Sequence, residues 1–182
     1  MKILSDILNN VSLSQTSGKM DMSINKVIFD SRKIENGSLF VATVGTQVDG
    51  HDFIEKAIRL GAVAVVCQEL PEKLTEGVTF VQVKDSSLAL GIMASNFYDN
   101  PSAKVKLVGT TGTNGKTTVS TLLFDLFREL GYNVGLLSTV ENKINDTVIP
   151  STHTTPDAVG LNALLAKMVD AGCTHCFMEV SY

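Results

Sequence analysis

The most informative stretch of the sequence is Gly109-Thr-Thr-Gly-Thr-Asn-Gly-Lys-Thr-Thr118. The apolar run 105–108 before it predicts a buried strand, and the residues after it predict a helix over 117–130 that Gly131 ends. Apolar side chains recur along that helix at helical spacing: Val119, Leu122, Leu123, Leu126, Phe127 and Leu130. A strand, a glycine-rich turn and a helix in this order are typical of a phosphate-binding loop.

The residue types in this loop suit a nucleotide phosphate. Glycines let the backbone curl so that several N–H groups point inward, and the helix N-terminus adds the positive end of its dipole. We expect Lys116 to reach the β- and γ-phosphates and Thr117 to bind Mg²⁺. The loop departs from the common pattern G-x-x-x-x-G-K-S/T, because Thr110 stands where that pattern has its first glycine. The alternative is a turn rich in glycine and threonine with a solvated lysine.

Composition excludes several classes of protein. With 44% hydrophobic and 19% charged residues, the 182-residue chain can bury a core. A net charge of −4 and scattered basic residues argue against nucleic acid as a partner, and no apolar run reaches the ~20 residues of a membrane span. The first residues do not resemble a signal peptide. The three cysteines, an odd number, fit a reducing compartment. We expect a cytoplasmic monomer with small-molecule partners.

The pair Cys173-Thr-His-Cys176 allows two interpretations. It could be half of a zinc site or a redox pair, or it could be two small side chains in a core. No second pair exists, and only His51 and His153 remain as distant candidate ligands. Because free cysteine is among the most buried residue types, we expect ordinary core side chains.

The chain divides near Asn100-Pro101-Ser102. Alternating elements are predicted on both sides of this point: strands at 27–29, 39–44, 62–67, 78–83, 105–108, 134–138 and 175–180, and helices at about 52–60, 86–98, 117–130 and 158–171. Strands joined by helical crossovers predict an α/β fold with a mostly parallel sheet, with ligands at the carboxyl ends of the strands. The second part ends on a strand, so we expect a truncated ATP-binding domain.

The loop resembles that of the Mur ligases, whose pattern G-x-x-G-T-N-G-K-T-T also lacks a glycine at the position of Thr110. Three earlier segments are similar to the UDP-binding domain of this family: Asp30-Ser-Arg32, 37–42 and Asp49-Gly-His-x-Phe-Ile54. Two more, 97–102 and Ser151-Thr-His-Thr-Thr-Pro-Asp157, resemble the branch that adds the third residue of the cell-wall stem peptide. The resemblance covers nearly the whole chain and departs at Tyr182, where the family has serine.

The resemblance implies a small N-terminal α/β domain, residues 1–101, that binds the UDP-sugar-peptide. Residues 102–182 would be the first part of a P-loop, parallel-sheet ATP-binding domain. The implied activity is ATP-dependent amide ligation, which adds diaminopimelate or lysine to UDP-N-acetylmuramoyl-L-Ala-D-Glu through an acyl phosphate in peptidoglycan synthesis. Residues that select the amino acid would lie beyond this chain, which alone is expected to be inactive. Alternatives are a dipeptide-adding or folylpolyglutamate-type ligase of the same superfamily, or a nucleotide-binding module.

The resemblance also assigns residues. It implies nucleotide contacts from Gly112, Thr113, Asn114, Gly115, Lys116, Thr117 and Thr118, with Lys116 as the catalytic residue and Thr117 and Glu179 as Mg²⁺ ligands. It implies substrate contacts from Phe29, Ser31, Thr46, Gln47, Val48, His153, Thr154, Thr155 and Ser181, although His153 has no assigned chemistry.

The residues alone leave alternatives open for several of these positions. Glu179 could be an ordinary carboxylate at the rim of a sheet, and Ser31 could belong to a turn capped with Asp30. The segment 151–155 could be a polar loop before a helix capped by Asp157. Arg32 could contact a phosphate or pair with Asp30.

Overall fold

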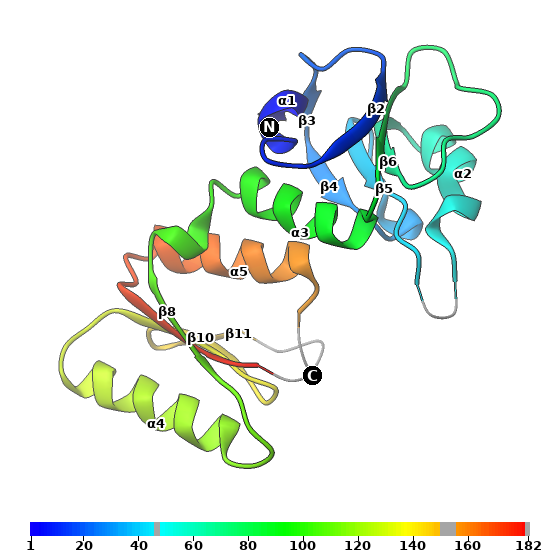
Figure 1. The fold of residues 1–182 in the computed structure, drawn as a ribbon. Helices are drawn as coiled ribbons and strands as arrows, with labels where there is room; N and C mark the ends of the chain where they lie inside the picture. The colour runs from blue at the N-terminus through cyan, green and yellow to red at the C-terminus, as the bar shows by residue number, and fades with distance from the viewer. Residues whose placement is uncertain (46–47, 150–155, 181–182) are drawn as a thin grey trace. The chain divides into compact units, whose positions relative to one another are not determined.

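A computed structural model describes residues 1–45, 48–149 and 156–180 (Figure 1). The chain forms two compact units, Met1–Phe97 and Tyr98–Tyr182. The boundary falls where helix α3 (Ser86–Phe97) ends, a few residues before the expected division at Pro101. Asp99 and Asn100 follow in the left-handed conformation, with φ of 62° and 51°, and lead into the short helix η3 (Pro101–Ala103). Each unit contains a five-stranded sheet.

The sheet of the first unit is mostly parallel, as expected. Its order is β2 (Leu13–Ser17), β7 (Thr79–Val83), β6 (Ala62–Cys67), β5 (Ser38–Val41) and β4 (Lys26–Ile28). The pairs from β4 to β7 are parallel, and β2 is antiparallel to β7. The central strands are nearly continuous apolar runs because the sheet is covered on both faces.

Helices complete the core of this unit. Helix α2 (Ile54–Arg59), preceded by the 3₁₀ helix η2 (Gly50–Phe53), packs Ile54 against buried Phe40 and Phe80 of the sheet. Helix α3 is capped by Asp85, whose Oδ1 accepts a hydrogen bond from Leu88 N at 2.9 Å. Strands β1 (Lys2–Ile3) and β3 (Ser23–Ile24), the single-turn helix α1 (Leu4–Ile7) and η1 (Ser31–Lys33) complete the unit. The expectations included neither β1, β2, β3 nor α1.

The sheet of the second unit is mixed. Its order is β11 (Thr147–Ile149), β10 (Asn142–Ile144), β9 (Val134–Leu137), β12 (His175–Glu179) and β8 (Lys106–Thr110). Strands β8, β12 and β9 are parallel, so their carboxyl ends meet at one edge. The hairpin of β10 and β11 is antiparallel and was not expected. Asn145 makes its turn with a φ of 51°.

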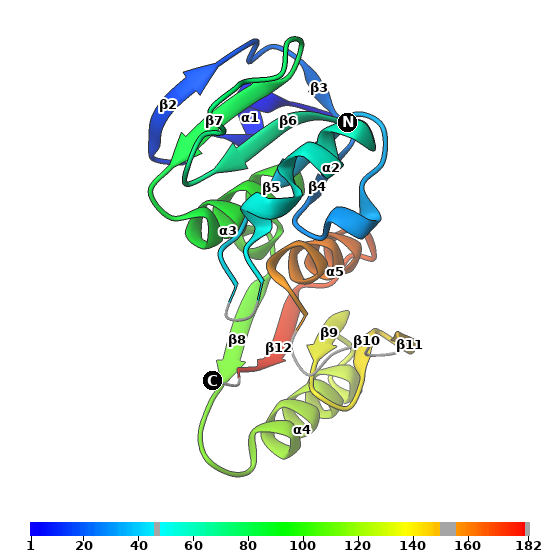
Figure 2. The same cartoon turned by 90° about the vertical axis from the view of Figure 1, so that its right-hand side faces the viewer.

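Two helices cover opposite faces of this sheet (Figures 1 and 2). Helix α5 (Ala158–Asp170) buries Leu165 and Met168 against Leu137 and Cys176. Helix α4 (Lys116–Glu129) buries Phe124 against Leu136 and Phe177, the strand neighbours of those two residues, which point the other way. The inward face expected for α5 is therefore confirmed.

The apolar face expected for α4 is partly wrong. Leu123 and Phe127 pack on the core, but Val119, Leu122, Leu126 and Leu130 are 44%, 63%, 52% and 62% exposed. Instead, Ser120 and Phe124 are buried, because the sheet covers only a narrow part of the helix surface. Helical spacing located the apolar residues but not the side that the strands cover. None of the helices in the described ranges combines the length and the hydropathy that a membrane span requires.

Candidate nucleotide and substrate sites

The glycine-rich loop lies where β8 ends and α4 begins, at the carboxyl edge of the parallel strands. Gly112 and Gly115 have φ of 146° and 80°, a conformation that other residues rarely adopt. A Cβ added to Gly115 would meet no atom within 4 Å, and one added to Gly112 would meet only Asn114 O at 3.7 Å. Glycine is therefore required by the backbone conformation, and the space around the loop is open.

The start of α4 and the Lys116 side chain together make this loop electropositive. The first N–H groups of the helix have no partner within it, since its first bond runs from Val119 N to Gly115 O at 2.9 Å. Gly115 has no side chain to cap them. The Lys116 Nζ donates to Gly112 O at 2.8 Å, so the ammonium lies over the loop. Free N–H groups, the helix dipole and an ammonium suit an anion with several oxygens.

Thr117 and Glu179 lie next to each other at the same sheet edge. Glu179 ends β12 in register with Thr110, and Thr117 Oγ1 donates to Glu179 Oε2 at 2.8 Å. Burial raises the pKa of Glu179, but hydrogen bonds from Thr139 and Thr117 and the charge of Lys116 outweigh it, so the pKa is lowered. Glu179 is therefore an ionised carboxylate beside a hydroxyl. The sequence predicted this proximity for two ligands of one cation.

This pair of oxygen donors fits Mg²⁺. The ion is usually held by one or two carboxylates together with phosphate oxygens and waters, not by a full cage of protein ligands. In keeping with this, the described ranges contain no cluster of three or more histidine, cysteine, aspartate or glutamate side chains that could hold a metal. One contact of Glu179 was not predicted. Thr139, just after β9, also donates to Glu179 Oε2.

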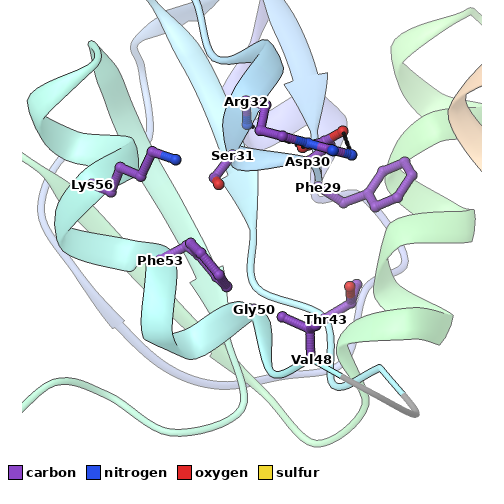
Figure 3. Close-up of a pocket in the computed structure, with 9 residues that line it drawn as sticks. All are labelled: Phe29, Asp30, Ser31, Arg32, Thr43, Val48, Gly50, Phe53 and Lys56. Carbon is purple, nitrogen blue, oxygen red and sulfur yellow. Dashed lines mark hydrogen bonds and ion pairs between the residues drawn. The ribbon is translucent and has the colours of Figure 1, made fainter.

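A second candidate site lies in the first unit. A cavity of about 470 Å³ opens at the carboxyl ends of β4 and β5 (Figure 3). It is lined by Phe29, Asp30, Ser31, Arg32, Thr43, Val48, Gly50, Phe53 and Lys56. Of the residues assigned to substrate by resemblance, the cavity includes Phe29, Ser31 and Val48. Gly50 and Phe53 belong to the segment 49–54 that resembles the UDP-binding domain, although no contact was assigned to them. Thr43 and Lys56 were not predicted.

The geometry of Arg32 agrees with the second alternative, a pairing with Asp30. Its Nε and Nη2 donate to Asp30 Oδ1 and Oδ2 at 2.9 and 2.8 Å, and Asp30 Oδ1 also caps η1 through Arg32 N at 3.0 Å. The hydrogen bond from Arg32 is the main cause that lowers the pKa of Asp30 to about 2. Lys56 makes no ion pair with any described residue, and its Nζ lies 5.8 Å from the centre of the Phe53 ring. Lys56 is thus the cation of this cavity that is not already paired.

His51 anchors η2, which carries the cavity residues Gly50 and Phe53. Its Nδ1 lies 2.6 Å from Asp49 Oδ1, and its Nε2 accepts a hydrogen bond from Gln68 N at 2.9 Å. Both ring nitrogens are therefore engaged, which excludes His51 as a free metal ligand. Gly50 N donates to Thr43 O at 2.9 Å and closes the base of the same loop.

The remaining expected residues have different outcomes. Cys67, Cys173 and Cys176 are all buried and free. Burial raises the pKa of Cys67 to about 11 and that of Cys176 to about 12, so the thiols stay protonated, and the interpretation as core side chains is confirmed. Several expected substrate contacts lie outside the described residues: Thr46, Gln47, His153, Thr154, Thr155 and Ser181.

Two sequence profiles match the chain. One, described as the Mur ligase middle domain, matches residues 110–182, and one described as the Mur ligase family, catalytic domain, matches residues 23–98. The chain belongs to the Mur ligase family. The first match includes most of the glycine-rich loop and Glu179, and the second includes every residue that lines the cavity.

Curated Mur ligases resemble the chain over most of its length. The UDP-N-acetylmuramoyl-L-alanyl-D-glutamate–2,6-diaminopimelate ligase of Cytophaga hutchinsonii is 62% identical over 179 residues, which is 98% of this chain. The ligase of the same name from Bacteroides fragilis is 53% identical over 178 residues. The chain spans 37% of the length of each of these relatives.

Solved Mur ligase structures share the fold. A structure of a UDP-N-acetylmuramoyl-L-alanyl-D-glutamate–2,6-diaminopimelate ligase superposes with a TM-score of 0.79 at 24% identity, over 99% of this chain and 36% of that one. The MurF ligase of Thermotoga maritima, in complex with ADP, gives a TM-score of 0.58 at 25% identity, over 85% of this chain and 31% of that one. The expected α/β fold, covering only part of a Mur ligase, is confirmed.

Proposed function

We propose that this chain is part of an ATP-dependent ligase that adds diaminopimelate to UDP-N-acetylmuramoyl-L-Ala-D-Glu in peptidoglycan synthesis. The observation that carries the proposal is the agreement of five relatives, 49–62% identical over 98% of the chain, which all bear the name of this activity. Their name also favours diaminopimelate over lysine, which the sequence left open. The reaction itself belongs to a longer protein, since the chain spans 37% of these relatives.

We assign UDP binding to residues 1–101. The cavity of the first unit combines two phenylalanine rings with one unpaired ammonium, that of Lys56, and the buried residue Ser31 (Figure 3). Apolar rings suit the faces of a nucleobase, and a hydroxyl with a cation suits a diphosphate. Arg32 keeps its pairing with Asp30 and shapes the turn that presents Ser31.

We assign the nucleotide phosphates to the loop of the second unit. The backbone of 112–115 and the first N–H groups of α4, at Lys116, Thr117 and Thr118, would hold the β- and γ-phosphates, and the Lys116 ammonium would neutralise them. Thr117 and Glu179 would hold Mg²⁺, which when bound neutralises the charge that develops during phosphoryl transfer. Such catalysis is mainly positioning and electrostatic stabilisation, and the loop and the helix end supply donors for both.

The proposed chemistry starts from the UDP-linked dipeptide and ATP. The free carboxylate of the UDP-linked dipeptide would attack the γ-phosphorus of ATP, releasing ADP and leaving an acyl phosphate. The amine of diaminopimelate would then attack the acyl carbon, and collapse of the tetrahedral adduct would give the amide and inorganic phosphate. We place this reaction in the cytoplasm, with small molecules as its partners.

The test is phosphate release by the full-length protein. We expect release to require ATP, Mg²⁺, the UDP-muramoyl-dipeptide and diaminopimelate together, with lysine at least tenfold poorer than diaminopimelate. Replacing the UDP-linked substrate by folate or by UDP-muramoyl-tripeptide should abolish it. Release that depends on folate, or that is equally fast without the dipeptide, would contradict the proposal.

A further inference from the structure

The chain turns sharply after β9, and Ser138 closes this turn. The Ser138 side chain is buried, and its Oγ donates to Glu141 O at 2.8 Å. The same oxygen accepts a hydrogen bond from Glu141 N at 3.1 Å. A turn held from both sides by one buried hydroxyl has little freedom, so the position of the next residue, Thr139, is fixed.

Thr139 presents two donors to one oxygen of Glu179. Its backbone N and its Oγ1 lie 3.2 and 3.1 Å from Glu179 Oε2. Thr117 Oγ1, in the first turn of α4, donates to the same oxygen at 2.8 Å. Within the described part of the chain, all of these hydrogen bonds end on Oε2, and none reaches Oε1. The carboxylate is thus held by one oxygen and leaves the other available.

We propose that Thr139 is a positioning residue that orients Glu179 for a divalent cation. The inference rests on the proposed nucleotide site, because the cation is the one that would accompany the phosphates. Thr139 fixes the rotation of the carboxylate and leaves Oε1 as the oxygen offered to the ion. Because the Thr117 hydroxyl donates its hydrogen to Glu179, its oxygen lone pairs remain free to bind the same cation. Partners that orient a ligating carboxylate change metal affinity by about 10- to 100-fold when they are removed.

Thr139 should therefore affect the cation and not the nucleotide alone. The test uses the 182-residue chain and measures calorimetric binding of ADP with a chelator present, and then at increasing Mg²⁺. We expect Thr139→Val, which keeps the N–H donor, to raise the Mg²⁺ concentration needed for half-maximal enhancement of ADP binding about tenfold. ADP affinity without Mg²⁺ should change less than about twofold. Thr139→Ser should behave as wild type, because it restores the hydroxyl.

The controls separate this role from a merely structural one. Thr147→Val makes the same change at an exposed position of β11 and should leave both measurements unchanged. Thr139→Ala serves as a second truncation, and thermal unfolding verifies that each variant folds. Unchanged Mg²⁺ dependence in Thr139→Val and Thr139→Ala, or an equal loss of ADP binding with and without Mg²⁺, would overturn the role of Thr139. Wild-type ADP binding that does not respond to Mg²⁺ would instead overturn the cation site itself.

Discussion

Lys116→Ala should weaken nucleotide binding while leaving the fold intact. The Lys116 side chain starts the first turn of α4 and folds back onto Gly112 O, and it packs in neither hydrophobic core of the second unit. Substitutions away from a core usually change stability by less than about 0.5 kcal/mol. The unfolding free energy of the variant should therefore stay within about 0.5 kcal/mol of wild type.

The loss of affinity follows from the charge that is removed. An ammonium at about 4 Å from a phosphate is worth at most about 4 kcal/mol in a partly exposed site. Part of this attraction to phosphate is offset, because the Lys116 ammonium must give up its hydrogen bond to Gly112 O. Hydrogen bonds to charged groups contribute about 1.5–3 kcal/mol net, so ADP should bind about 10- to 100-fold more weakly.

The assay is calorimetric titration of Mg²⁺-ADP into wild type, Lys116→Ala and the control Lys104→Ala. Lys104 is an exposed lysine of the same unit, just after η3, so that its replacement by alanine removes the same net charge as Lys116→Ala. The control should bind within about twofold of wild type at physiological salt, where a distant charge is screened. Near-normal binding by Lys116→Ala, or an equal loss in both variants, would refute the assignment of the loop.

Three further outcomes are expected. Gly135→Ala should destabilise the second unit by about 1–3 kcal/mol in denaturant unfolding, since the new Cβ would lie 2.2 Å from Met168 Sδ. Its control, Gly91→Ala, lies in α3 with open space around it and should instead stabilise the first unit by about 0.5–1 kcal/mol. Asp30→Asn should lower the free energy of unfolding by about 1 kcal/mol at pH 7, after solvent screening is allowed for. Because the pKa of Asp30 is depressed in the folded state, the difference from wild type should shrink as the pH falls from 3.8 to about 2. A difference that does not depend on pH would refute the ion pair as its source. Lys56→Met should weaken UDP binding about tenfold and uridine binding hardly at all, and an equal loss for both would show that Lys56 does not meet the diphosphate.

The central parallel strands were predictable because burial on both faces leaves a continuous apolar run. The prediction that the strand at 105–108 is buried was wrong: β8 lies at the edge of its sheet and most of its side chains are exposed. Strand β6 was expected at 62–67 and is observed there, and Asp85 and Asp157 cap their helices as aspartate before a helical pattern suggests. The loop was predictable for another reason, since its glycines adopt φ values that few other residues tolerate. In each case local chemistry and the final structure agree.

Other elements carried too little local signal. Strand β2 is almost fully exposed and polar, and β10 and β11 have three residues each, so neither shows an apolar pattern that singles it out. On the outer side of α4 an apolar pattern is present but the residues are exposed. Apolar spacing does not reveal how much of a helix a sheet covers.

The site was only partly readable for a related reason. The sequence predicted that Glu179 and Thr117 lie close together, as they do. It did not predict that Thr139 contacts Glu179, although Thr139 is a polar residue just past the carboxyl end of a parallel strand. The end of β9 lies beside the end of β12, which carries the Glu179 carboxylate, and this neighbourhood could have indicated Thr139. Lys56 could not be found in this way, because its place in the cavity depends on how α2 packs on the sheet.

The most direct test of two separate nucleotide sites is a pair of titrations followed by backbone amide shifts. UDP should perturb amides around the cavity, at 29–32 and 48–53, and Mg²⁺-ADP should perturb those of the loop at 111–118. Each ligand should leave the other set unchanged. If UDP shifts the loop, if ADP shifts the cavity, or if neither set responds, the division of the two substrates between the two units is contradicted.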